Sequence, residues 1–155
     1  MTRILVVDDD PLVRTAIGAW LASQSIEVVA ADGARAGLKA LDQHAAFDLM
    51  LIDIFMPDME GLESIRIFHG RAPTMPIIAM SGIMFRQHLG SAPDFLGMAT
   101  RMGATFCLHK PFRLRELLQA IEHCLPASPA SRETPEPAFP PVARDNDSQS
   151  GFPLG

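Results

Sequence analysis

The chain has 155 residues, of which 48% are hydrophobic and 20% charged, a balance typical of one globular domain with a sizeable core. Its formal net charge of -5 argues against binding to nucleic acid or to an anionic membrane surface. We expect no signal peptide and no membrane span, because no apolar stretch is long enough for either. The two cysteines, Cys107 and Cys124, are too few for a disulfide framework and fit no metal-binding spacing, so we expect a reduced, cytoplasmic protein.

Short and nearly continuous apolar runs recur along the chain. They span residues 3–8, 26–31, 48–53, 75–80 and 104–109. Such runs are typical of parallel strands that are covered on both faces by helices. Each run is therefore predicted to be a strand of one sheet.

Segments with helical spacing lie between these runs. After the first run, one apolar stripe carries Val13, Ile17 and Leu21, and after the last run a similar stripe carries Leu117 and Ile121. Further helices are expected near residues 33–44, 60–70 and 92–102. The alternation predicts a doubly wound α/β fold around a five-stranded parallel sheet with right-handed crossovers.

The pattern stops after Leu125. Residues 126–155 are rich in Pro, Ser and small residues and contain few apolar anchors. Such a segment cannot bury enough surface to offset the entropy lost on ordering. We therefore predict a folded domain over residues 1–125 and a disordered tail over 126–155. A polyproline-type docking segment around "PEPAFPP" is the alternative function for part of this tail.

Carboxylates follow the first and third predicted strands. Asp8 ends the first strand, Asp9 follows it, and Asp53 ends the third. In a parallel α/β sheet these strand ends meet at one edge, where ligands bind. Neighbouring carboxylates repel, and a hard divalent cation, Mg²⁺ above all, would offset that repulsion. Asp10 has a structural explanation, because Asp followed by Pro11 is a good start for a helix.

Two further polar residues fall at the same edge. Ser81 follows the fourth run and Lys110 follows the fifth. Carboxylates, a metal, a cation and a hydroxyl in one place suit phosphoryl transfer, in which Asp53 can be the nucleophile. The alternative is that the acids are merely exposed strand ends. Of the five histidines, which show no ligand spacing, only His109 is expected near this edge.

Taken together, these residues resemble the receiver domain of bacterial two-component response regulators, of the chemotaxis-regulator type. The resemblance covers roughly residues 3–124 and is carried by "VVDDD", "LIDIFMPDMEG", "MSG" and "HKPF". It implies the flavodoxin-like receiver fold. It also implies that a sensor histidine kinase or a histidine phosphotransfer protein donates a phosphoryl group to the chain, with Mg²⁺ as the cofactor.

The resemblance assigns roles to the acidic residues. Asp53 matches the phosphoacceptor, and Asp8 and Asp9 match the acidic pair that holds the metal. Phe55 matches the position whose backbone carbonyl binds the metal.

The resemblance also assigns roles outside the acidic cluster. Ser81 matches the switch hydroxyl and Lys110 the lysine that contacts the phosphoryl group. Pro57 and Gly61 match the turn after the phosphoacceptor. The peptide bond between Lys110 and Pro111 is expected to be cis, as in family members.

The sequence departs from the family pattern in three places. Cys107 stands where the family usually has an aromatic residue that moves inward on activation. The segment 82–102 is longer than usual by about seven residues, either for partner selection or as a tolerated insertion. Phe55 and Ile83 stand where polar residues are common, and we expect their bulk to exclude water and to prolong the phosphorylated state. The phosphate lifetime of Phe55→Asn, which we expect to be shorter, tests this.

The predicted function is that of a stand-alone response regulator that catalyses only its own phosphorylation and dephosphorylation. With no further domain expected after Leu125, the output would pass through an unknown downstream protein. The alternatives are a docking module that works without phosphorylation and a Mg²⁺-dependent phosphatase. The phosphatase would need a second acid two residues after Asp53, and that residue is Phe55.

Overall fold

A computed structural model describes residues 1–44, 46–56, 61–82 and 95–125. Five parallel strands form one sheet in the order β2-β1-β3-β4-β5. The strands are β1 (Arg3–Val7), β2 (Glu27–Ala31), β3 (Leu49–Asp53), β4 (Ile77–Ser81) and β5 (Phe106–His109). The helices are α1 (Pro11–Ala22), α2 (Ala34–Gln43), α3 (Gly61–Arg71), α5 (Phe95–Met102) and α6 (Leu114–Cys124). The predicted α/β fold and its parallel sheet are confirmed.

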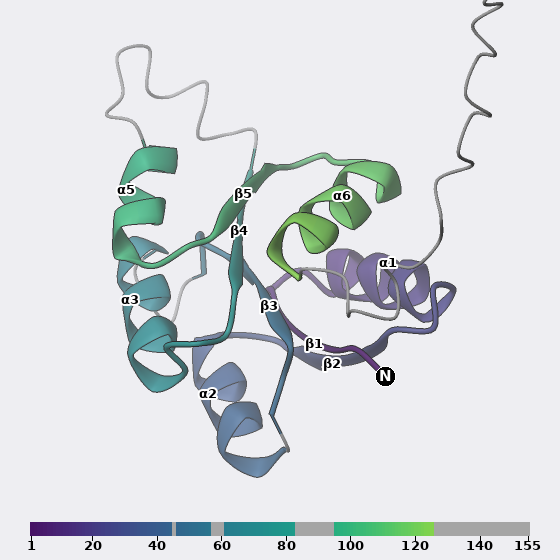
Figure 1. Cartoon of the computed structure of the whole chain (residues 1–155), viewed down its shortest axis with the longest axis horizontal. Coiled ribbons are helices and arrows are strands. Elements are labelled where there is room, and N and C mark those ends of the chain that lie inside the picture. Colours follow the sequence, from purple (N-terminus) through teal and green to yellow (C-terminus); the bar gives the residue numbers. More distant parts are fainter. Residues whose placement is uncertain (45, 57–60, 83–94, 126–155) are drawn as a thin grey trace, which may run out of the picture.

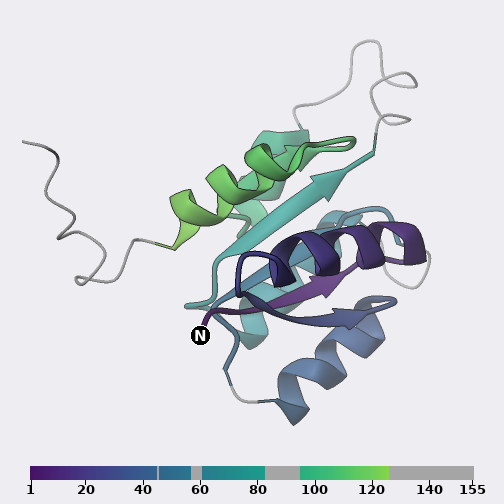
Figure 2. The ribbon, with the colours of Figure 1, turned by 90° about the vertical axis from the view of Figure 1, so that its right-hand side faces the viewer.

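The helices form two layers, one on each face of the sheet (Figures 1 and 2). Helices α1 and α6 cover one face, and α2, α3 and α5 cover the other. This division follows from the alternation of side chains along each strand. In β1, Ile4 and Val6 pack under α1 and α6, whereas Leu5 and Val7 pack under α2 and α3.

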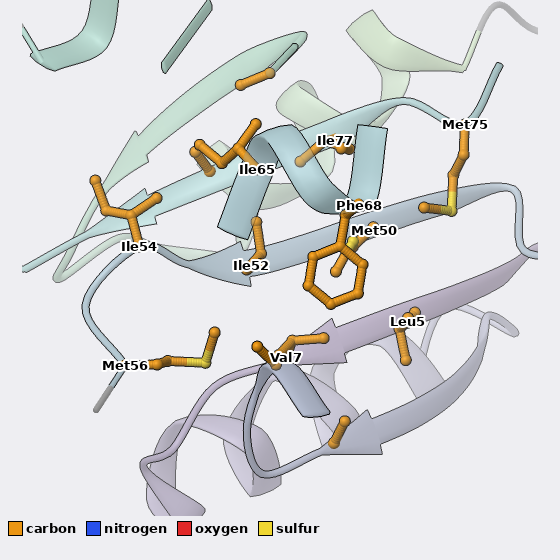
Figure 3. Close-up of a cluster of buried hydrophobic side chains, with 14 of the residues drawn as sticks. Leu5, Val7, Met50, Ile52, Ile54, Met56, Ile65, Phe68, Met75 and Ile77 are labelled. Atoms are coloured by element: carbon orange, nitrogen blue, oxygen red, sulfur yellow. The ribbon is translucent and has the colours of Figure 1, made fainter. Parts of the chain in front are cut away.

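The central strands are buried throughout. Every residue of β3 and β4 is buried, which explains why their sequences are apolar up to the last residue, Asp53 or Ser81. On one face the core centres on Phe68 of α3, which lies over Leu5, Val7 and Met50 (Figure 3). No helix in the described part of the chain is long and apolar enough to cross a membrane.

Two strands differ from their predicted character. Strand β2 is an edge strand, and Glu27 and Ala30 are exposed, because the sheet continues on only one side of it. Strand β4 starts at Ile77 and includes Ser81, which the sequence placed after the strand. It extends this far because the Ser81 carbonyl accepts a hydrogen bond of 2.7 Å from the Lys110 backbone N–H.

The predicted start of the first helix is confirmed. The Asp10 carboxylate accepts a hydrogen bond of 2.9 Å from the Leu12 backbone N–H, and Pro11 is the first helical residue. The Lys110–Pro111 peptide bond is cis, as the resemblance implied.

Some predictions fall outside the described residues. They concern Pro57, Ile83, most of the long segment after Ser81 and the tail over 126–155. The last described helix, α6, ends at Cys124, one residue before the predicted domain boundary.

Candidate functional site

The first and third strands bring two carboxylates to the same edge of the sheet. Strands β1 and β3 pair directly, with Val7 opposite Ile52, so Asp8 and Asp53 follow neighbouring positions. Val6 and Leu51, two residues earlier, both pack on the side of α1 and α6. By the alternation of a strand, Asp8 and Asp53 therefore lie on that same side.

Asp8 is completely buried, and each of its two carboxylate oxygens has a partner. Oδ1 accepts a hydrogen bond of 2.9 Å from the Asp10 backbone N–H. Oδ2 lies 2.5 Å from Nζ of Lys110. The Asp8 carbonyl also accepts a hydrogen bond of 2.7 Å from the Arg14 guanidinium. This buried charge is tolerable because it is both paired and hydrogen-bonded.

Asp53 is also buried, at 6% exposure, but its carboxylate is less tightly held. Oδ1 accepts a hydrogen bond of 2.9 Å from the Phe55 backbone N–H, and Oδ2 lies 3.3 Å from Lys110 Nζ. Burial raises the pKa of Asp53 above its ordinary value, and the nearby charge of Asp8 adds to that rise. The Phe55 hydrogen bond and the positive charge of Lys110 oppose the rise without cancelling it.

Lys110 joins the two buried carboxylates. It follows β5 directly and reaches both Asp8 and Asp53 with its single ammonium group. Burial by itself would lower the pKa of Lys110, but the hydrogen bond and charge of Asp8, together with Asp53, raise it above its ordinary value. The ammonium group is therefore charged at neutral pH and stands where an anion on Asp53 would meet it.

Three carboxylates at this edge fit a hard divalent cation. One oxygen from each of Asp8, Asp9 and Asp53 lies within 4.8 Å of the others. Asp9 is exposed, so a partly hydrated ion can approach from solvent. An oxygen-only donor set with open positions for water suits Mg²⁺. The donor chemistry of these residues therefore fits the predicted metal, and the Phe55 carbonyl follows two residues after Asp53.

Ser81 has a partner that the sequence analysis did not anticipate. Its hydroxyl oxygen lies 3.1 Å from Nδ1 of His109, and both residues end their strands. The sequence placed His109 near the site but gave it no role. The available signal was its position directly before Lys110, at the end of a strand beside that of Ser81.

The other residues singled out from the sequence have ordinary environments. Phe55 is 40% exposed. Cys107 is half-buried on β5 and packs against the α2, α3 and α5 side of the core. Cys124 is buried, which raises the pKa of its thiol and keeps it in the unreactive protonated form.

An apolar groove lies beside the site. It has a volume of about 280 Å³ and runs between α1 and the segment that leads into α6. Its lining consists of Val13, Ala16, Ile17, Trp20, Lys110, Pro111 and Phe112. Because Lys110 belongs both to this lining and to the carboxylate cluster, the groove adjoins the site.

A family model described as "Response regulator receiver domain" matches residues 4–122. The chain belongs to the response regulator receiver domain family. The chain is 34% identical over 143 residues to "Response regulator protein FleR" of Pseudomonas aeruginosa. That match covers 92% of this chain but only 28% of FleR, and the chain spans 53% or less of the length of the first curated relatives it matches.

Solved receiver structures share the fold. A response regulator receiver domain protein described as CheY-like, from Methanospirillum hungatei, superposes with a TM-score of 0.69 at 31% identity. The match covers 79% of this chain and 91% of that one. The chemotaxis protein CheY4 of Vibrio cholerae gives a TM-score of 0.69 at 27% identity, covering 81% of this chain and 99% of that one. The expected receiver fold is confirmed.

Proposed function

We propose that this receiver domain accepts a phosphoryl group on Asp53 from a phosphohistidine of a sensor histidine kinase or a histidine phosphotransfer protein. The observation that supports this most strongly is the convergence of Asp8, Asp9, Asp53 and Lys110 at one edge of the sheet. Family membership supports the histidine donor.

In the proposed reaction, a carboxylate oxygen of Asp53 attacks phosphorus in line with the leaving nitrogen. The new O–P bond forms as the P–N bond breaks, and the bonding electron pair leaves with the imidazole of the donor. Lys110, now shared between Asp8 and Asp53, would contact an oxygen of the transferred group. The transfer consists mostly of positioning and charge neutralisation, which this chain's fixed charges can provide.

Mg²⁺ is the proposed cofactor. The Asp9 and Asp53 carboxylates and the Phe55 carbonyl would bind it directly, and Asp8 would contact it through water. When bound, Mg²⁺ would neutralise the charge on the phosphoryl oxygens. Asp8 would then orient the site, because its two oxygens already bind the Asp10 N–H and Lys110.

Signalling would follow from the phosphorylation of Asp53. It would involve Ser81 and contacts with a downstream protein. We propose that the chain catalyses only its own phosphorylation and dephosphorylation, in the cytoplasm. The downstream partner would be another protein, since a net charge of -5 does not attract nucleic acid.

The deciding experiment is intact-mass spectrometry after incubation with acetyl phosphate, with and without Mg²⁺. We expect one phosphate adduct that requires Mg²⁺ and that disappears in Asp53→Asn. Asp10→Asn is the matched control, because it removes a carboxylate two residues from Asp8 while Asn still caps α1. An adduct that persists in Asp53→Asn would overturn the assignment of the phosphoacceptor.

If acetyl phosphate gives no adduct, a purified histidine kinase labelled with radioactive phosphate is the second donor. Failure with both donors would favour a docking module that works without phosphorylation.

A further inference from the structure

The Ser81 hydroxyl, which the family resemblance gives as the switch hydroxyl, contacts the neighbouring strand β5. Ser81 and His109 are direct partners in the parallel pairing of β4 with β5. Their side chains meet at 3.1 Å, between the Ser81 hydroxyl and His109 Nδ1. The backbone hydrogen bond of 2.7 Å from Lys110 N–H to the Ser81 carbonyl fixes the register next to this contact.

The contact lies on the opposite side of the sheet from the acids. Ala79 and Cys107, two residues before Ser81 and His109, both pack on the side of α2, α3 and α5. By strand alternation Ser81 and His109 point to that side, whereas Asp53 follows Leu51 to the side of α1 and α6. Ser81 is only 8% exposed, so its choice of partner is set mainly by protein groups.

A serine hydroxyl has one proton to donate. If that proton is directed to Nδ1 of His109, it is not available to an oxygen on Asp53. A phosphoryl group on Asp53 would have to draw the hydroxyl toward the edge of the sheet and away from this ring. His109 and the phosphoryl group are therefore competing partners for one hydroxyl.

We propose that His109 is a positioning residue that holds the Ser81 hydroxyl in the resting state and competes with a phosphoryl group on Asp53 for it. This inference rests on the proposed phosphorylation of Asp53. It assigns to His109 a restraint on activation.

The test measures the concentration of beryllofluoride, a phosphoryl mimic, that half-saturates the shift of the Ser81 amide in NMR spectra with Mg²⁺ present. We expect His109→Leu to lower this concentration about threefold to tenfold, the size expected for one hydrogen bond. In a Ser81→Ala background the titration is followed at the Gly82 amide. There His109→Leu should not change the half-saturating beryllofluoride concentration.

Two polar variants separate the contact from general packing. In His109→Asn the amide group takes the place of Nδ1, so we expect nearly the wild-type concentration. In His109→Gln the amide reaches the place of Nε2 instead, so we expect behaviour like that of His109→Leu. If His109→Leu does not fold, the comparison of His109→Asn with His109→Gln still tests the proposal.

The proposal is overturned if His109→Gln and His109→Asn require the same beryllofluoride concentration, or if the effect of His109→Leu persists without the Ser81 hydroxyl. Failure of the proposed function looks different, because the wild-type protein itself would then show no Asp53-dependent response to beryllofluoride.

Discussion

At the scale of single residues, the site depends on how two buried carboxylates share one ammonium group. Lys110 is 2.5 Å from Asp8 and 3.3 Å from Asp53, so its charge is committed more to Asp8. For Asp53, the contacts with Lys110 and the Phe55 N–H do not offset the cost of burying its charge, so its pKa is raised. The buried Asp53 carboxylate is therefore less stabilised as an anion than an exposed carboxylate would be.

This raised pKa predicts that Asp53→Asn stabilises the metal-free protein. A raised pKa in the folded state means that ionised Asp53 costs stability above its folded pKa and costs nothing below its unfolded pKa. We therefore expect the melting temperature of Asp53→Asn at pH 7.5 to exceed that of the wild type by a few degrees. The gain should shrink as the pH falls toward 3.8, the ordinary value for this carboxyl group.

Thermal unfolding followed by circular dichroism, without Mg²⁺, measures the difference. Adding Mg²⁺ should reduce it, because the metal would stabilise the wild type more than the variant. An Asp53→Asn protein that melts below the wild type at pH 7.5 would show that the Lys110 contact outweighs the burial of the carboxylate.

At the scale of helices and strands, packing explains why two helical glycines have different requirements. Gly37 of α2 faces β1 and α3, and a Cβ there would lie 2.8 Å from Val7 Cγ2 and 3.0 Å from Phe68 Cζ. Gly18 of α1 has no such neighbour within 4 Å. A small residue is thus required where α2 approaches the core and is unnecessary on α1.

The matched substitutions Gly37→Ala and Gly18→Ala should therefore change stability in opposite directions. We expect Gly37→Ala to lower the free energy of unfolding by about 1–3 kcal/mol, because the core is already filled at that point. We expect Gly18→Ala to raise it by about 0.5–1 kcal/mol through the higher helix propensity of alanine. Urea unfolding measures both, and equal effects would contradict the close packing of α2.

The existence and order of these elements followed from the sequence more reliably than their ends did. The hydrophobic stripe of the first helix and the Asp10–Pro11 start were sufficient to place α1. The end of β4 was missed by one residue because Ser81 is polar and looks like the start of a loop. Its place in the strand depends on a hydrogen bond from Lys110, which is far away in the sequence.

At the scale of the whole molecule, α6 is the last described element of the fold. Leu117, Ala120, Ile121 and Cys124 of this helix are buried against the sheet. The family match ends at residue 122, close to the end of the helix. Residues 126–155 contain the Pro-rich and Ser-rich composition for which the sequence predicts disorder.

We therefore predict that the protein truncated after Leu125 keeps the wild-type melting temperature and urea m-value. The m-value should not change, since it reflects the surface buried on folding, to which the tail is predicted to contribute nothing. Truncation after Arg113, which deletes α6, is the control and should abolish cooperative unfolding. A lower m-value after removal of the tail alone would show that the tail packs on the domain.

The sequence by itself determined the fold class, the strand ends that carry the acids, and the family. These follow from local patterns, namely apolar runs, helical stripes and motifs at strand ends. Such patterns can be recognised in the sequence without knowledge of any tertiary contact. Only the tertiary structure decided that Lys110 reaches both Asp8 and Asp53 and that the Ser81 hydroxyl contacts His109 Nδ1. Those contacts join residues that are far apart in the chain. They depend on the register of the strands and on the side of the sheet on which each residue lies.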